Sequence, residues 1–144
     1  GGGALTAGTD RTSSTSSLSA APGGTGAGVP NAFGTSGESS GGFYHFAGGG
    51  GGASRADYIY PSVPTNGGLG GGGNGGSAVG CGILANPSMN ATANTGGGGG
   101  GGASSTDNPA SPGPGYAYHW PGVPLNAAGG SGGSGIVIIR YKYQ

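Results

Sequence analysis

Large apolar side chains are sparse along this chain, and they form no helical pattern. Leucine, glutamate, lysine and arginine, which favour helices, are scarce, and no stretch repeats apolar residues at intervals of three and four. We therefore expect essentially no α-helix. The C-terminus differs, because residues 135–143 contain a β-branched run that passes into alternation, which predicts a strand. We expect this strand to close the fold and to act in assembly through Ile136, Val137, Ile138, Ile139 and Tyr141.

Glycine runs occupy much of the remaining chain, and the longest is Gly96–Gly102. The 144 residues include 42 glycines and 10 prolines, a share that is typical of low-complexity segments. Charged residues make up only 6% and the net charge is zero, whereas disordered chains are rich in charge. We therefore expect an ordered, all-β or irregular fold in which extended glycine tracts bond to one another laterally. These tracts are either polyproline-II-like helices (polyglycine II) or layers of a β-sandwich, and the sequence leaves both open.

The chain contains an internal repeat. Tyr58–Gly68 and Tyr118–Gly130 share the order Tyr-x-aromatic-Pro-small-Val-Pro-x-Asn before a glycine tract, and Gly28–Gly34 is a weaker copy. The prefix "GGGGGAS" precedes both strong copies, at Gly48–Ser54 and Gly98–Ser104. We call the aromatic and proline motif of each copy its corner. The copies differ in the length of the loop between prefix and corner, and in repeat proteins such insertions usually lie on one face, often the binding face. We divide the chain into a repeat domain over 48–144 and a segment 1–47 that is either a connector or a degraded first repeat.

The shortage of large apolar side chains also bears on assembly. Ordering the backbone costs about 1–2 kcal/mol per residue, and glycine returns no side-chain burial. We therefore expect a homo-oligomer or contacts with other proteins of a larger assembly. Lysine and arginine total four and form no basic patch, which argues against nucleic acid. The longest aliphatic run, Ile136–Ile139, is too short for membrane insertion.

Aromatic clusters are the candidate binding residues. Tyrosine, tryptophan and histidine can stack on sugar rings and also dominate protein interfaces. Phe43, Tyr44, His45 and His119 vary between the copies and are candidate receptor contacts. Three neighbouring aromatic residues are added to them as candidates: Phe46, Tyr116 and Tyr118. The residues that recur in both copies are interpreted as structural corners: Tyr58, Tyr60, Pro61, Val63, Pro64, Asn66, Trp120, Pro121, Val123, Pro124 and Asn126.

No group of residues points to catalysis or to a metal. The two histidines have no cysteine or carboxylate at ligand spacing, and Cys81 is interpreted as a small buried hydrophobe. The acidic residues lack the spacing of a calcium loop and are interpreted as solvated loop residues: Asp10, Glu38, Asp57 and Asp107. We expect no enzyme activity, no cofactor and no metal.

Two motifs resemble a known family. "GGGGGGGAS" at Gly96–Ser104 and "GGSGGSGIVIIRY" at Gly129–Tyr141 are similar to the glycine-rich C-terminal domains of bacteriophage tail and tail-fibre proteins. A related design is found in the detachable adhesins of some long tail fibres, where polyglycine helices pack in layers and loops at one end contact the host. The resemblance covers roughly 48–144, whereas 1–47 departs from it.

The resemblance implies a structural and adhesive role at the virion surface, outside the host cell. The partners would be copies of the chain, other virion proteins, and a host-surface glycan or protein. The alternative is a self-assembling filament or virion decoration protein with no receptor role. A third class, an ice-binding polyglycine bundle, requires a flat face of small residues, and the corners rich in proline and aromatic residues argue against it.

Overall fold

A computed structural model describes residues 1–9, 21–30, 36–54, 64–79, 83–103, 128–139 and 141–142 of the chain. These ranges contain no α-helix. Their strands are short: β1 (Ala27–Val29), β2 (Glu38–Ser40), β3 (Phe43–Phe46), β4 (Ser77–Val79) and β5 (Ile83–Asn86). The predicted non-helical, all-β character is therefore confirmed for the described part of the chain.

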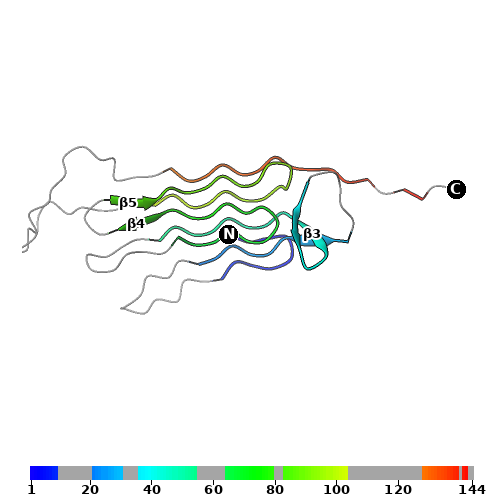
Figure 1. Ribbon diagram of the computed structural model, residues 1–144, viewed down its shortest axis with the longest axis horizontal. Helices are drawn as coiled ribbons and strands as arrows, with labels where there is room; N and C mark the ends of the chain where they lie inside the picture. The colour runs from blue at the N-terminus through cyan, green and yellow to red at the C-terminus, as the bar shows by residue number, and fades with distance from the viewer. Residues whose placement is uncertain are drawn as a thin grey trace, which may run out of the picture.

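The strands form two small antiparallel sheets at opposite ends of an elongated molecule (Figure 1). One sheet has the order β1-β3-β2, so β3 is its central strand. The register pairs His45 of β3 with Gly28 on one side and with Glu38 on the other. The other sheet is the pair β4-β5, whose register shifts between Ser77 and Ala78.

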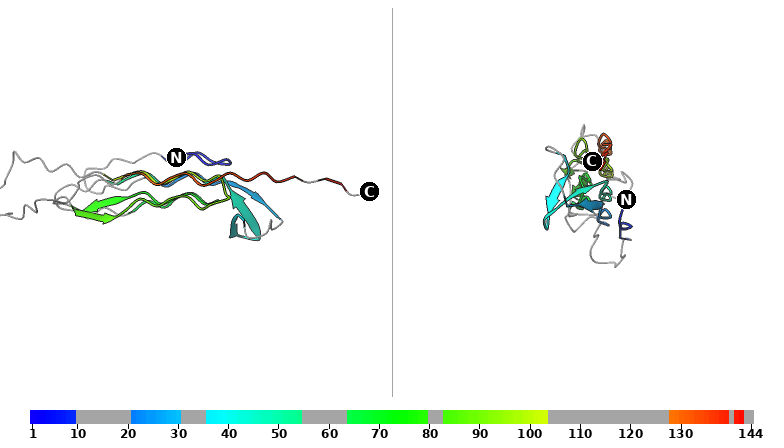
Figure 2. Two further views of the ribbon diagram at one scale, coloured as in Figure 1. Left: turned by 90° about the horizontal axis from the view of Figure 1, so that it is seen from above. Right: turned by 90° about the vertical axis from the view of Figure 1, so that its right-hand side faces the viewer.

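Extended glycine tracts run lengthwise between the two sheets, and several views show them side by side (Figures 1 and 2). Three of these tracts are joined in a closed ring of backbone hydrogen bonds. We call residues 48–54, 70–76 and 98–101 the central trio. Each member donates N–H groups to one neighbour and accepts from the other, so the backbone polar groups that meet inside the trio are satisfied.

The hydrogen bonds of the central trio recur at every third residue. Tract 48–54 donates to tract 70–76, which donates to 98–101, which donates back to 48–54. The donor–acceptor pairs are Gly48–Gly70, Gly51–Gly73, Ser54–Gly76, Gly73–Gly98, Gly76–Gly101, Gly98–Gly48 and Gly101–Gly51, with N···O distances of 2.9 to 3.0 Å. In a β-strand, residues that face one neighbour would recur with a period of two.

Further tracts attach around the central trio. Residues 128–134 bond to the third member and to the residue before it, through Gly130 N–H to Gly100 C=O at 2.8 Å and Gly133 N–H to Gly97 C=O at 2.9 Å. Here too the donors are three residues apart. The two tracts run antiparallel, because the residue number of the acceptor falls as that of the donor rises.

Small and polar side chains fill the interior of this arrangement. Among the described residues, Phe46 and Ala103 are the buried hydrophobic ones, whereas Ser77 and Thr95 are almost completely buried. Thr95 Oγ1 donates to Thr92 C=O at 2.6 Å, and Ser77 Oγ accepts from the Asn86 side-chain amide at 3.0 Å. The interior is thus held by satisfied polar groups and by backbone contact.

The described residues of segment 1–47 bond directly to the repeat domain. The Gly1 ammonium donates to Gly50 C=O at 2.8 Å, and Gly49 N–H donates to Gly24 C=O at 2.8 Å. The division of the chain at residue 47 stays a prediction. Its two sides are nevertheless joined along the bundle.

The predicted closing strand over 135–143 is not formed by those of its residues that the structure describes. Residues 135–139 and 141–142 belong to no strand, and no backbone hydrogen bond joins them to another described part of the chain. The segment continues from tract 128–134 past the end of the bundle (Figures 1 and 2). A strand forms only against a neighbour with which it exchanges backbone hydrogen bonds, and this segment has none among the described residues.

Candidate functional site

The sheet β1-β3-β2 carries the predicted binding residues that the structure describes. Its β2–β3 hairpin turns through Gly41 and Gly42, whose φ angles are 60° and 82°. A two-residue loop with positive φ at both positions is a type I′ turn, which glycine adopts without strain. The turn pairs β3 with β2, and β1 pairs with the other edge of β3, so β3 is the central strand of the sheet at this end of the molecule (Figure 1).

Phe43 and His45 form an aromatic pair on one face of β3. They alternate with Tyr44 and therefore share a face, and their rings meet edge to face with centroids 6.5 Å apart and an interplanar angle of 61°. Phe43 is 47% exposed and His45 is half-buried. The pair therefore offers an accessible phenyl surface backed by a fixed imidazole.

A glycine on the neighbouring strand makes room for His45. Gly28 lies directly opposite His45 in the register, and a Cβ on Gly28 would stand 2.9 Å from the imidazole Cε1. The imidazole Nδ1 is buried, and it has no hydrogen-bond partner among the described residues. Most buried polar atoms are paired, so this nitrogen has unused hydrogen-bonding capacity beside the exposed ring of Phe43.

The last residue of β3 lies in the core, in contrast to its prediction as a receptor contact. Phe46 is 8% exposed, and its ring lies over Gly37, where a Cβ would stand 2.7 Å from the ring Cζ. The physical reason is alternation along a short strand, because Phe46 and Phe43 point to opposite faces and only one of those faces is covered.

Glu38 joins the sheet to the glycine bundle, although the sequence pattern suggested a solvated loop residue. Its carboxylate Oε2 accepts hydrogen bonds from the N–H groups of Gly70 and Gly71, at 2.7 and 2.9 Å. The two glycines have φ angles of 108° and 85°, and successive amides of such a turn can converge on one anion. No local signal reveals this contact, because its partners are 32 and 33 residues apart in the sequence.

The other predicted binding and corner residues mostly lie outside the described residues. Pro64 and Asn66 are described, and both are exposed within a tract where Asn66 C=O accepts from Gly23 N–H. The structure therefore brings together Phe43, Tyr44 and His45 only. The remaining predictions lie outside its described ranges: Tyr58, Tyr60, Pro61, Val63, Tyr116, Tyr118, His119, Trp120, Pro121, Val123, Pro124 and Asn126.

The chemistry of the described sheet is that of a contact surface. The described ranges hold no cluster of three or more His, Cys, Asp or Glu side chains that could bind a metal ion. No helix within them is long and apolar enough to cross a membrane. No protein-family model, curated protein or solved structure is significantly similar to the chain. Function must therefore be inferred from the residues and their geometry.

Proposed function

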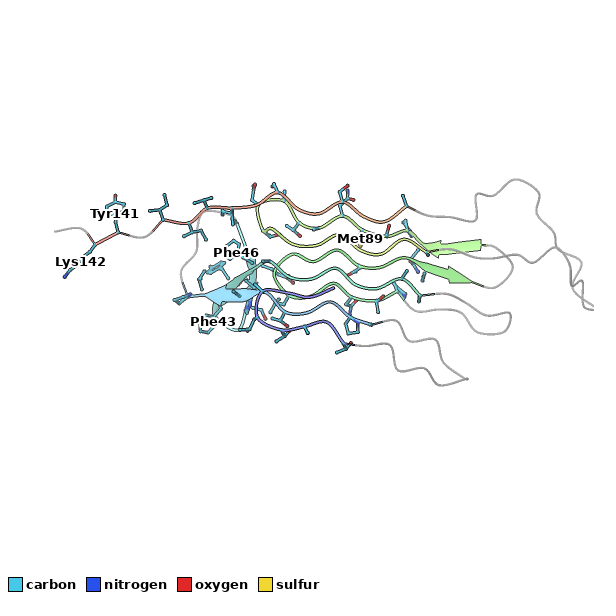
Figure 3. All side chains as sticks on the ribbon, turned by 180° about the vertical axis from the view of Figure 1, so that it is seen from behind. Phe43, Phe46, Met89, Tyr141 and Lys142 are labelled. Atoms are coloured by element: carbon cyan, nitrogen blue, oxygen red, sulfur yellow. The ribbon has the colours of Figure 1, made fainter. Side chains whose placement is uncertain are left out.

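We propose that the chain is a structural and adhesive component of a virion: a glycine-rich tail or tail-fibre domain, outside the host cell, that presents contact residues to a host-surface glycan or protein. The observation that carries this proposal is the ring of hydrogen bonds in the central trio. It builds a long body from bare backbone, with an aromatic surface at one end (Figure 3). A rod that carries its bulky side chains at its end suits an adhesive role, and the terminal and glycine-rich motifs resemble tail-fibre domains.

The architecture that we propose for the tracts is polyglycine II. A polyproline-II-type helix has three residues per turn, so every third residue faces the same neighbour. The spacing of Gly48, Gly51 and Ser54 as donors to one neighbouring tract fits this period. It favours polyglycine II over the β-sandwich that the sequence left open. Copies of the chain or other virion proteins would bind along or at the ends of this bundle.

Phe43 and His45 are the described residues best suited to contact the receptor. A phenyl ring exposed by about half can stack on the apolar face of a sugar or on an apolar side chain. The imidazole of His45 meets this ring edge to face, with centroids 6.5 Å apart, and supports it. The predicted contacts Tyr116, Tyr118 and His119 stay part of the proposal.

The test is binding of the full chain to an array of bacterial surface polysaccharides and to whole bacterial cells. We expect binding that weakens about 10-fold in Phe43→Ala, because loss of a ring at the centre of an interface costs more than 1 kcal/mol. Met89→Ala is the matched control, since Met89 is 55% exposed and lies on the bundle, away from the sheet β1-β3-β2 that carries Phe43 (Figure 3). Failure to bind any polysaccharide or cell would refute the receptor role.

The alternative function, a self-assembling filament or virion decoration protein with no receptor role, is favoured by the exposed apolar C-terminal segment. Val137 and Ile139 are 86% and 78% exposed, and clustered apolar side chains on a surface commonly mark a protein contact. Electron microscopy of the purified chain distinguishes the two functions. Regular filaments in which the Phe43 surface is buried between subunits would support the alternative.

A further inference from the structure

The described residues of the C-terminal segment 136–142, which are 136–139 and 141–142, form an unpaired edge. No backbone hydrogen bond joins them to the rest of the described chain, and all of them except Ile136 are exposed. Val137, Ile139 and Tyr141 are 86%, 78% and 80% exposed, and they occupy alternate positions of an extended chain. Tyr141 and Lys142 lie well beyond the end of the bundle (Figure 3).

The described surface offers this segment no apolar partner other than itself. Seven large hydrophobic residues are exposed in the described ranges, and four of them lie in this segment, the other three being Leu5, Phe43 and Met89. These three are separate in the sequence and form no continuous run. A second copy of the segment, by contrast, supplies an equal row of apolar side chains and an equal row of free N–H and C=O groups. Exposed edges of this kind pair readily with another chain.

We propose that two copies of the chain pair through residues 136–142 as antiparallel strands about a two-fold axis near Ile139. In this register Val137 of each copy lies opposite Tyr141 of the other, and Ile139 lies opposite its own counterpart. All six side chains share one face, so the exposed apolar row of each copy is covered. The proposal is independent of the receptor-binding role, because it uses a different part of the chain.

Charge decides the direction of pairing. The segment carries Arg140 and Lys142 and no acidic residue, and residues 128–144 contain none either. Parallel pairing in register would place Arg140 opposite Arg140 and Lys142 opposite Lys142, and like charges directly opposite each other destabilise a strand pair. Antiparallel pairing places each Arg140 opposite Ile138, so the two guanidinium groups become diagonal neighbours instead of direct ones. It also places each Lys142 opposite Ile136 and separates the two ammonium groups by about 20 Å, beyond the Debye length of about 8 Å at physiological salt.

Antiparallel pairing also fits the placement of the segment. The segment projects past the end of the bundle, so two bundles that meet through it point away from each other (Figure 2). The product is a rod of two bundles joined end to end. An isologous interface of this kind closes on itself and does not lead to open fibres.

The first measurement is the mass of the full chain by sedimentation equilibrium, at concentrations up to about 100 μM, well above the Kd of a stable pair. We expect twice the single-chain mass of 13.2 kDa. The double variant Val137→Lys/Ile139→Lys should return to the single mass at the same concentration. Met89→Lys, which changes an exposed apolar residue outside the segment, should keep the doubled mass. A single mass for the unsubstituted chain, or a doubled mass that persists in the double variant, would overturn the proposal.

The second measurement tests the direction of pairing. A spin label at Gly132→Cys, in a Cys81→Ser background, probes a position where a Cβ meets nothing closer than Gly97 C=O at 3.6 Å. Antiparallel pairing about Ile139 separates the two labels by 14 residue steps, or roughly 45 Å. Parallel pairing would bring them within about 20 Å, and such a distance would contradict the proposal. Neither measurement involves a host glycan, so failure here leaves the receptor role to be judged by its own test.

Discussion

At the scale of the residue, the absence of Cβ atoms sets how closely the tracts approach. A Cβ on Gly100 would lie on the carbonyl oxygen of Asn74, and one on Gly50 would lie on that of Gly99. Such contacts bring Cα atoms against carbonyl oxygens, where weak Cα–H···O interactions add to the N–H···O bonds. Glycine is therefore required at these positions for the space it leaves rather than for its flexibility.

This requirement predicts different effects for alanine at two glycines. Gly100→Ala should lower the free energy of unfolding by about 1–3 kcal/mol, because the new methyl group must displace backbone that other hydrogen bonds hold. Gly132→Ala should change it by less than about 0.5 kcal/mol, since its nearest neighbour is 3.6 Å away. Urea unfolding followed by tyrosine fluorescence measures both. Equal effects of the two substitutions would contradict the close packing of the tracts.

At the scale of the element, the hairpin β2–β3 is locally encoded and its attachment to the bundle is not. The sequence Ser39-Ser40-Gly41-Gly42-Phe43 has the two-glycine loop that is typical of a type I′ hairpin. The contact of Glu38 with the turn at Gly70 and Gly71 depends instead on how the chain folds back. It holds the sheet that carries Phe43 against the end of the bundle.

Removal of the Glu38 carboxylate should loosen this attachment. We expect Glu38→Ala to speed amide hydrogen exchange at Gly70 and Gly71 about 5-fold. That factor corresponds to about 1 kcal/mol for charge-assisted hydrogen bonds at an exposed site. Glu38→Gln should have a smaller effect, because its amide oxygen can still accept. The control is Ser39→Ala, an exposed change on the same strand. Exchange rates that do not respond to either Glu38 variant would show that the carboxylate does not hold the turn.

At the scale of the whole molecule, the fold buries backbone where most domains bury apolar side chains. Phe46 and Ala103 are the buried hydrophobic residues of the described chain, and its buried polar residues are serines and threonines. The stability of the bundle must therefore come largely from lateral hydrogen bonds and close contact between tracts. Apolar and polar surface contribute to the heat capacity of unfolding with opposite signs.

This balance predicts a small heat-capacity change on unfolding. We expect a value per residue clearly below the 12–15 cal/mol/K that is usual for globular domains, because mainly polar backbone becomes hydrated. Differential scanning calorimetry at several pH values measures it from the slope of the unfolding enthalpy against the midpoint temperature. A conventional domain of similar length serves as the reference. A value within the usual range would indicate that apolar burial, not backbone contact, stabilises the molecule.

Some features of this protein follow from local sequence, and others required the folded chain. The lack of helical periodicity excluded helices, and glycine runs dictated extended backbone that needs lateral partners, because both depend only on neighbouring residues. The β-branched run at the C-terminus predicts a segment suited to pairing, and this stays a prediction. Its placement as a closing strand failed, because pairing depends on which neighbour is within reach.

The sequence alone thus determined the kind of backbone, and the tertiary structure decided its partners. Glycine tracts carry no side chains that could distinguish one register from another, so nothing local says that Gly48 bonds to Gly70 and accepts from Gly98. The burial of Phe46, the exposure of Phe43 and the contact of Glu38 with two distant amides likewise depend on which faces and turns meet. These are long-range contacts, and only the folded chain brings their members together.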